Sequence, residues 1–189
     1  MSRAEATKAR ILQAAAAEFA AHGIAGARVD RIALAANANK NLLYIHFQNK
    51  QRLFEAVFDA EVATGLGRVP FTADDLPGYA VRLFDYYREH PNVLRLATWQ
   101  RLEIGDDGAE PAGASEVHAA KIAELAAAQA DGRIATRIPP TALLTIILAV
   151  AAAWAPVGTG AIPHAAATGQ DPAVSREAVA EAIRVLITG

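Results

Sequence analysis

Two short apolar stripes, separated by a three-residue break, constrain the fold of this chain most strongly. They occupy residues 28–47, RVDRIALAANANKNLLYIHF, and each has the spacing of a single helical face. The stripes consist of Val29, Ile32, Ala33 and Ala36 before the break, and of Leu43 and Phe47 after it. This pattern predicts two short helices joined by a tight turn, as in a helix-turn-helix. An ordinary pair of surface helices in an all-α protein is the alternative.

The break contains the residue types that such a turn needs. Asn37 enters the left-handed conformation at low cost, so we expect it to end the first short helix. Asn39 is a strong N-cap residue that can bond the free N–H groups of the second. Ala33 is small enough for two steeply crossing helices to approach closely. We assign Leu43 and Phe47 to the core.

The rest of the chain has helical periodicity and no alternation typical of strands. The chain is rich in alanine and leucine and only 6% aromatic, which favours helix over sheet. Gly23 should end the first helix, and Gly65 and Gly67 the one that Asn49 caps. Besides the short pair, we expect seven helices, over residues 7–22, 50–64, 76–90, 92–104, 115–131, 140–156 and 172–187. Loops or linkers are expected at 67–77, 105–115 and 158–172. We predict an all-α fold of about nine helices.

Charge is distributed unevenly along the chain. Residues 1–55 contain eight Lys and Arg against four acids, whereas residues 56–189 contain ten against 16. A basic head on an acidic body is expected if only the head meets a polyanion. We therefore predict a DNA-binding domain over residues 4–64, with its helix-turn-helix at 28–47, and a larger helical domain over 65–189.

Several classes of protein are disfavoured by what the sequence lacks. The chain has no cysteine, no Gly-x-Ser-x-Gly elbow and no glycine-rich phosphate loop. Its five histidines never pair at helical metal-ligand spacing, so we expect no enzyme activity, metal or cofactor. The N-terminus lacks a signal-peptide layout, and the longest apolar run, 142–157, is too short to span a bilayer. We expect a cytoplasmic protein that does not enter membranes.

The first third of the chain resembles the tetracycline-repressor (TetR) family of bacterial transcription regulators. The matching segments are TKARILQAAAAEFAAHG and ARVDRIALAANANKNLLYIHFQNKQRLF, without a gap. Beyond residue 68 only the helix count and the His-Pro between two helices match. Relative to the family, Asn37 replaces glycine, Arg28 replaces a capping Thr or Ser, Leu42 replaces Ser or Thr, and Ile45 replaces a frequent aromatic. Arg28 should therefore leave its helix without a side-chain cap, and the sequence preference stays open.

The second short helix should enter the major groove of double-stranded DNA. Lys40 and Asn41 are the base-edge candidates, Lys for guanine and Asn for adenine. The resemblance implies phosphate contacts for Tyr44 and His46. Residues at helix starts are further candidates for phosphate contacts, because free N–H groups and the helix dipole attract anions there. Asn39 is expected mainly to cap its helix and only secondarily to contact a base. These further candidates are Thr7, Arg28 and Lys50. Each of these residues also has an interpretation without DNA contact. Tyr44 would then lie at the border of the core, His46 would cover Phe47, and Lys40 and Lys50 would be solvated surface charges.

The body should supply a dimer surface and an effector pocket, both mainly on the strength of the resemblance. Paired heads imply a homodimer on a palindromic operator, formed through the two C-terminal helices. A central core helix at 141–157 is the alternative. The pocket candidates are Phe84, Tyr87, Trp99, Leu102, His118 and Trp154, and an ordinary core would contain the same residues.

We therefore expect a sequence-specific DNA-binding transcriptional repressor that a small-molecule effector of unknown chemistry releases from its operator. The competing hypothesis is a helical bundle that binds another protein and has no affinity for DNA. Salt dependence separates the two, because neutralising several phosphates makes DNA affinity fall steeply with salt concentration.

Overall fold

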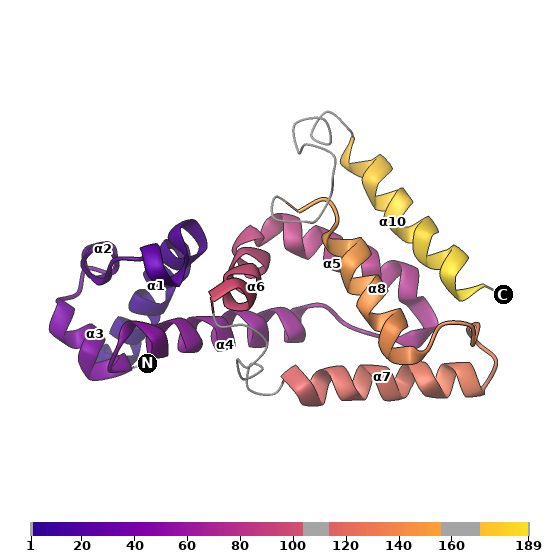
Figure 1. Ribbon diagram of the computed structural model, residues 1–189, viewed down its shortest axis with the longest axis horizontal. Coiled ribbons are helices and arrows are strands. Elements are labelled where there is room, and N and C mark those ends of the chain that lie inside the picture. The colour runs from indigo at the N-terminus through magenta and orange to yellow at the C-terminus, as the bar shows by residue number, and fades with distance from the viewer. Residues whose placement is uncertain (1, 104–113, 156–170, 189) are drawn as a thin grey trace. The chain divides into compact units, whose positions relative to one another are not determined.

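The computed structural model describes residues 2–103, 114–155 and 171–188 (Figure 1). These residues form nine α-helices and one 3-10 turn and contain no strand, which confirms the predicted all-α fold. The helices are α1 (Arg3–Gly26), α2 (Val29–Ala35), α3 (Lys40–Phe47), α4 (Lys50–Arg68), α5 (Leu76–Glu89), α6 (Pro91–Glu103), α7 (Ala114–Ala130), α8 (Pro140–Ala152) and α10 (Pro172–Ile187), with the 3-10 turn η1 (Ala73–Asp75). The predicted loop at 105–115 and linker at 158–172 lie almost wholly outside the described residues.

The chain divides into two compact units. The first unit comprises residues 1–64 and 92–112, and the second comprises 65–91 and 113–189. The first unit thus includes α6, which lies outside the domain that we predict over residues 4–64. Each unit has its own buried side chains.

The first unit is built around a buried aromatic cluster. Phe54 of α4 contacts Phe19 of α1 edge to face, with ring centroids 5.3 Å apart, and stacks on Phe58 at 6.0 Å. Leu43 and Phe47 of α3 are buried in the same core, as predicted, and α6 contributes Leu96. Edge-to-face and offset contacts are the favoured geometries of aromatic pairs, so this cluster both buries area and orients the helices.

Helix α1 differs from its predicted bounds at both ends. It begins at Arg3 because Ser2 and Glu5 form a capping box, in which the serine hydroxyl accepts from Glu5 N and the glutamate accepts from Ser2 N. At Gly23, with φ 69° and ψ −179°, the backbone leaves the helical conformation, so the first continuous run of α1 ends at this glycine as predicted, and a short helical turn beyond the kink continues to Gly26.

Two other helix ends were also misplaced. Helix α4 runs through Gly65 and Gly67 to Arg68, although both glycines were expected to end it. Helix α8 ends at Ala152, four residues before the predicted end at 156. Glycine inside a helix costs less than about 1 kcal/mol relative to alanine, so neighbouring residues decide whether the helix continues.

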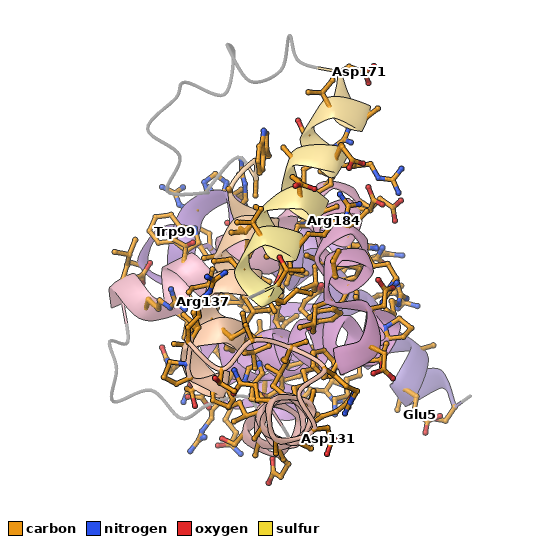
Figure 2. The ribbon with its side chains drawn as sticks, turned by 90° about the vertical axis from the view of Figure 1, so that its right-hand side faces the viewer. Glu5, Trp99, Asp131, Arg137, Asp171 and Arg184 are labelled. Atoms are coloured by element: carbon orange, nitrogen blue, oxygen red, sulfur yellow. The ribbon has the colours of Figure 1, made fainter. Side chains whose placement is uncertain are left out.

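In the second unit, α5 is the central helix. It packs against α10, α8 and η1, and α7 packs against α8 and η1. Phe84 of α5 meets Trp154 edge to face, with ring centroids 6.0 Å apart. Arg137, labelled in Figure 2, donates to the carbonyl oxygens of Val185 (2.9 Å) and Thr188 (2.7 Å), and so satisfies the C-terminal end of α10.

Lys121 of α7 is buried in the second unit, with 8% of its surface exposed. Its Nζ donates to the Tyr79 hydroxyl at 2.8 Å and lies 5.6 Å from the Phe71 ring centroid and 5.0 Å from that of Tyr79. Burial lowers the pKa of the Lys121 ammonium and raises the pKa of the Tyr79 phenol. The aromatic faces and the phenol oxygen partly replace water around the charge.

We expect this lysine to make stability depend on pH. The window runs from the lowered pKa of Lys121 in the folded protein to the pKa of about 10 that lysine has in the unfolded chain. Within it Lys121 is protonated in the unfolded chain but not in the folded one, so the free energy of unfolding rises with pH. The Lys121→Met variant should lack this rise. Urea unfolding of both proteins between neutral pH and pH 10 measures the difference, and parallel curves would contradict the prediction.

No helix in the described part of the chain is both long enough and apolar enough to cross a membrane. The most apolar helix, α8, instead turns one side inward, with Leu143, Leu144 and Ile147 buried.

Candidate nucleic-acid interface

The turn between α2 and α3 has the geometry that its sequence predicts. Asn37 adopts φ 48°, in the left-handed region, directly after Ala36, the C-cap residue of α2. Asn39 is the N-cap of α3, and its side-chain oxygen accepts from Leu42 N at 2.9 Å. Ala38 N donates back to Ala33 O at 3.0 Å and closes the turn. Both asparagine predictions are confirmed, and the two short helices are held as a helix-turn-helix (Figure 1).

The start of α2 is held by a carboxylate from another helix. Arg28 is the N-cap residue and makes no side-chain capping bond, as predicted. Glu18 of α1 instead fixes the chain at this point, because its Oε1 accepts from Arg28 N at 2.9 Å and from Arg31 Nε at 2.8 Å. Burial alone would raise the pKa of Glu18, but the bonds from Arg31 and the Arg28 N–H outweigh it and lower the pKa. The Glu18 carboxylate is therefore ionised at neutral pH.

Helix α3 has one buried side and one exposed side. Leu43 and Phe47 are buried, with 2% and 6% of their surfaces exposed. Ile45 lies two residues from each of them, hence about 160° away around the helix, and is 73% exposed. Asn41, one turn before Ile45, is also exposed. The side of α3 that faces away from the core is therefore formed by Asn41 and Ile45.

Tyr44 and His46 lie on opposite flanks of this exposed side, each about 80–100° from Ile45. Tyr44 is 43% exposed, and His46 is half-buried with its ring centroid 6.0 Å from that of Phe47. Flanking positions of a helix in the major groove face the two phosphate backbones. This placement agrees with phosphate contacts from both residues and also with their packing beside the core.

The two predicted lysine contacts are engaged within the protein. Lys40 Nζ lies 2.8 Å from Asp30 Oδ1 of α2, and this carboxylate raises the lysine pKa through its hydrogen bond and its charge. Lys50 Nζ donates to Ala25 O at 3.0 Å and to Ala27 O at 3.2 Å. Lys50 thus joins the start of α4 to the end of α1.

Thr7 lies inside α1, not at its start, because the capping box moves the helix start to Arg3. Its hydroxyl accepts from Arg10 Nη2 at 3.3 Å. Arg10 Nε in turn donates to Ala36 O at 3.2 Å, at the end of α2. This contact fixes α1 to the helix-turn-helix, and local sequence patterns did not indicate it.

A contact between α6 and the bend of α1 was also missed in the sequence. The carboxylate of Glu103 accepts from Ile24 N and from Ala25 N, both at 2.8 Å. Trp99, one turn earlier on α6, donates from Nε1 to Ala20 O at 3.4 Å. These two side chains cover Gly23 and satisfy the N–H groups that the bend leaves free.

The predicted pocket residues are divided between the two units. Trp99 and Leu102 belong to the first unit, where Leu102 is 71% exposed. In the second unit, Phe84 and Trp154 contact each other, and burial raises the pKa of half-buried Tyr87 to about 12, with Tyr86 contributing. His118 is half-buried on α7. The pocket as one constellation of six residues is therefore not seen within either unit.

A surface groove of about 670 Å³ occurs elsewhere in the second unit, between the start of α5 and α10. Its lining combines charged residues, among them Asp75, Arg176 and Arg184, with small and apolar ones, and Arg184 is labelled on α10 in Figure 2. None of the six pocket candidates lines it. Among the described residues, no three His, Asp or Glu side chains converge as a metal site would require.

Comparisons with known proteins match most of the chain to models of one family of regulators. The model of bacterial regulatory proteins of the tetR family matches residues 11–57, and that of the tetracyclin repressor-like C-terminal domain matches 75–184. The HTH-type transcriptional repressor SCO4008 of Streptomyces coelicolor is 45% identical over 154 residues, 81% of this chain and 80% of that protein. The repressor NicS of Pseudomonas putida is 29% identical over 110 residues, 54% of this chain and 52% of that protein.

A solved structure of similar shape is the transcriptional regulator SCO4942, also from Streptomyces coelicolor. It superposes with a TM-score of 0.85 at 35% identity and covers 96% of this chain and 98% of that chain. The likeness therefore extends through both units and is not confined to the helix-turn-helix.

Proposed function

This chain belongs to the TetR family of bacterial transcription regulators, and we propose that it acts as a homodimer whose paired α3 helices bind the half-sites of a palindromic operator. It is a DNA-binding transcriptional repressor that responds to a small molecule, and not an enzyme. The first unit supplies DNA contact, and the second unit supplies dimerisation and effector binding.

The observation that carries DNA contact is the exposed side of α3. Asn41 and Ile45 face away from the core, while buried Leu43 and Phe47 anchor the helix. The major groove of B-DNA admits one helix presented in this way. We propose base contacts from Asn41 and Lys40 and phosphate contacts from Tyr44, His46, Arg28, Thr7 and Lys50. Lysines that already bond carboxylate or carbonyl oxygens retain further N–H groups for phosphate or base oxygens.

The dimer proposal rests on the outward sides of α8 and α10. On α8, small residues are exposed at helical spacing, with Ala142, Thr145 and Ala149 in one row. On α10, Val174 and Val185 are 50% and 57% exposed. Small side chains allow close helix packing, and apolar surface of this kind is stabilised when a second copy covers it. A two-fold axis through these helices would double each contact.

Effector binding is proposed for the second unit because its interior is rich in aromatic side chains. Phe84, Tyr87 and Trp154 lie there, together with the buried Lys121 and Tyr79. Aromatic surroundings with a few polar groups are typical of small-molecule sites. Because its target is chromosomal DNA, we also propose that the protein works in the cytoplasm.

Fluorescence anisotropy with the DNA upstream of the protein's own gene tests the proposed function. Wild-type affinity should fall linearly with the logarithm of salt concentration, with a slope of about −0.9 per phosphate neutralised. The double variant Lys40→Ala, Tyr44→Ala should bind at least about tenfold more weakly and with a shallower slope. Arg101→Ala, which removes an exposed cation outside the motif, should match the wild type. Salt-independent or absent wild-type binding would favour the helical-bundle alternative.

A further inference from the structure

We infer that Ile45 is a specificity-determining residue that recognises the C5-methyl group of thymine, so that each operator half-site contains an A·T pair facing the exposed side of α3. This inference rests on the proposed function, because it assumes that α3 lies in the major groove. It goes further by assigning a base class to the operator, which the lysine and asparagine candidates alone do not provide.

The position of Ile45 is the first observation. It is 73% exposed and projects from the side of α3 directly opposite Leu43 and Phe47. A single exposed isoleucine on a protein surface needs no explanation. On a helix that lies in the major groove, however, the side opposite the core faces the base edges, so an apolar side chain there meets bases and not phosphates.

The chemistry of the groove leaves one partner for such a side chain. Base edges in the major groove present hydrogen-bond donors and acceptors, and the thymine C5-methyl is their characteristic apolar group. Isoleucine has no donor or acceptor, so facing a G·C pair would dehydrate polar edges without replacing their bonds. When isoleucine faces thymine, its own apolar surface and that of the C5-methyl group are both buried.

The neighbours of Ile45 point to the same base pairs. Asn41 lies one turn before it on the exposed side, and its amide suits the N6 and N7 groups of adenine. Leu42, half-buried and three residues before Ile45, adds a second apolar side chain to this side. Lys40, the candidate for guanine, lies at the start of α3, five residues before Ile45, and its Nζ lies 2.8 Å from Asp30 Oδ1. The exposed side of α3 beyond Lys40 thus carries groups suited to A·T pairs.

The test removes single methyl groups from the operator. Full-length protein first selects its binding duplex from a random library, and we expect A·T pairs near the centre of each half-site. Each thymine of the half-site is then replaced by deoxyuridine, which lacks only the C5-methyl. Loss of one methyl from an apolar contact, at about 0.8 kcal/mol, weakens binding about fourfold, and about 15-fold when both half-sites are changed.

A double-mutant cycle assigns the methyl contact to Ile45. Ile45→Ala should bind the thymine and deoxyuridine duplexes equally, while wild type distinguishes them. Leu34→Ala is the matched control, because Leu34 is 84% exposed but lies on α2; it should retain the wild-type methyl dependence. Thermal melting checks that each variant is folded.

Two results would overturn the inference and leave the proposed function intact. One is specific DNA binding with no loss at any deoxyuridine position, or with no thymine selected. The other is methyl dependence that persists in Ile45→Ala, since another residue would then make the contact. Absence of any selected DNA would contradict the inference and the proposed function together.

Discussion

Replacing Gly23 with alanine is expected to destabilise the first unit by about 3–5 kcal/mol. Gly23 has φ 69° and ψ −179°, a combination that is essentially restricted to glycine. An added Cβ would collide with Glu103 Oε1 and would lie 2.9 Å from Trp99 Cε3. Glu103 could move only by giving up its bonds to Ile24 N and Ala25 N. Conformational strain and steric overlap therefore add.

Two other glycines separate these contributions. Gly26 is near Gly23 but has no positive φ, and its added Cβ would come no closer than 3.5 Å to His22 Cβ, so Gly26→Ala should be neutral or slightly stabilising. Gly132 has φ 71° with no atom within 4 Å of an added Cβ. Gly132→Ala should therefore cost only the left-handed strain, about 1–2 kcal/mol.

Urea unfolding monitored by tryptophan fluorescence measures the effect. The chain has two tryptophans, so a Trp154→Phe background leaves Trp99, beside Gly23, as the reporter of the first unit. A loss of this size is a large part of the stability of a typical domain, so operator binding should fall as well. If Gly23→Ala unfolds at the same urea concentration as Gly26→Ala, the bend does not need glycine.

Replacing Ala149 with glutamate should convert the proposed dimer to a monomer and weaken operator binding about 10²–10⁴-fold. Ala149 is exposed on α8, in the row of small residues that we assign to the dimer surface. Two-fold symmetry would bring both carboxylates into one interface, where burial of unpaired charge is costly. A monomer binds one half-site and loses the high effective concentration of its second head.

Ala127→Glu provides the matched control for this change. Ala127 is also an exposed helical alanine, but it lies on α7, away from the assigned surface. Light scattering coupled to gel filtration should find a dimer for this control and a monomer for Ala149→Glu, and anisotropy measures operator affinity in parallel. A dimeric Ala149→Glu with wild-type affinity would place the dimer surface elsewhere.

The helix-turn-helix could be predicted in detail because its determinants are local. Asn37 ends α2 in the left-handed region, Asn39 caps α3, and Leu43 and Phe47 enter the core, all as their residue types and spacing indicate. Helix ends that depend on glycine were less predictable. Gly23 ends the regular part of α1 as predicted, whereas Gly65 lies within α4, because packing on distant residues decides what a glycine does.

Local sequence patterns do not identify which aromatic residues line a pocket. Aromatic residues at helical spacing have the same sequence pattern in a pocket and in an ordinary core. Trp99 covers the bend of α1, and Phe84 packs on Trp154 in the other unit. Sequence spacing carries no information about which unit a helix such as α6 joins.

Local patterns were sufficient to predict the all-α class and the helix-turn-helix, because caps, turn residues and apolar periodicity act over a few residues, and the family followed from the resemblance of the first third of the chain. Only the tertiary structure decided which side chains serve the motif from a distance. Glu18 holds the start of α2, Glu103 satisfies the bend of α1, and Asp30 of α2 pairs with Lys40 of α3. Such contacts join residues that are ten to 79 positions apart, and no local pattern records them. The burial of Leu43 and Phe47 in the core leaves Asn41 and Ile45 on the exposed side of α3.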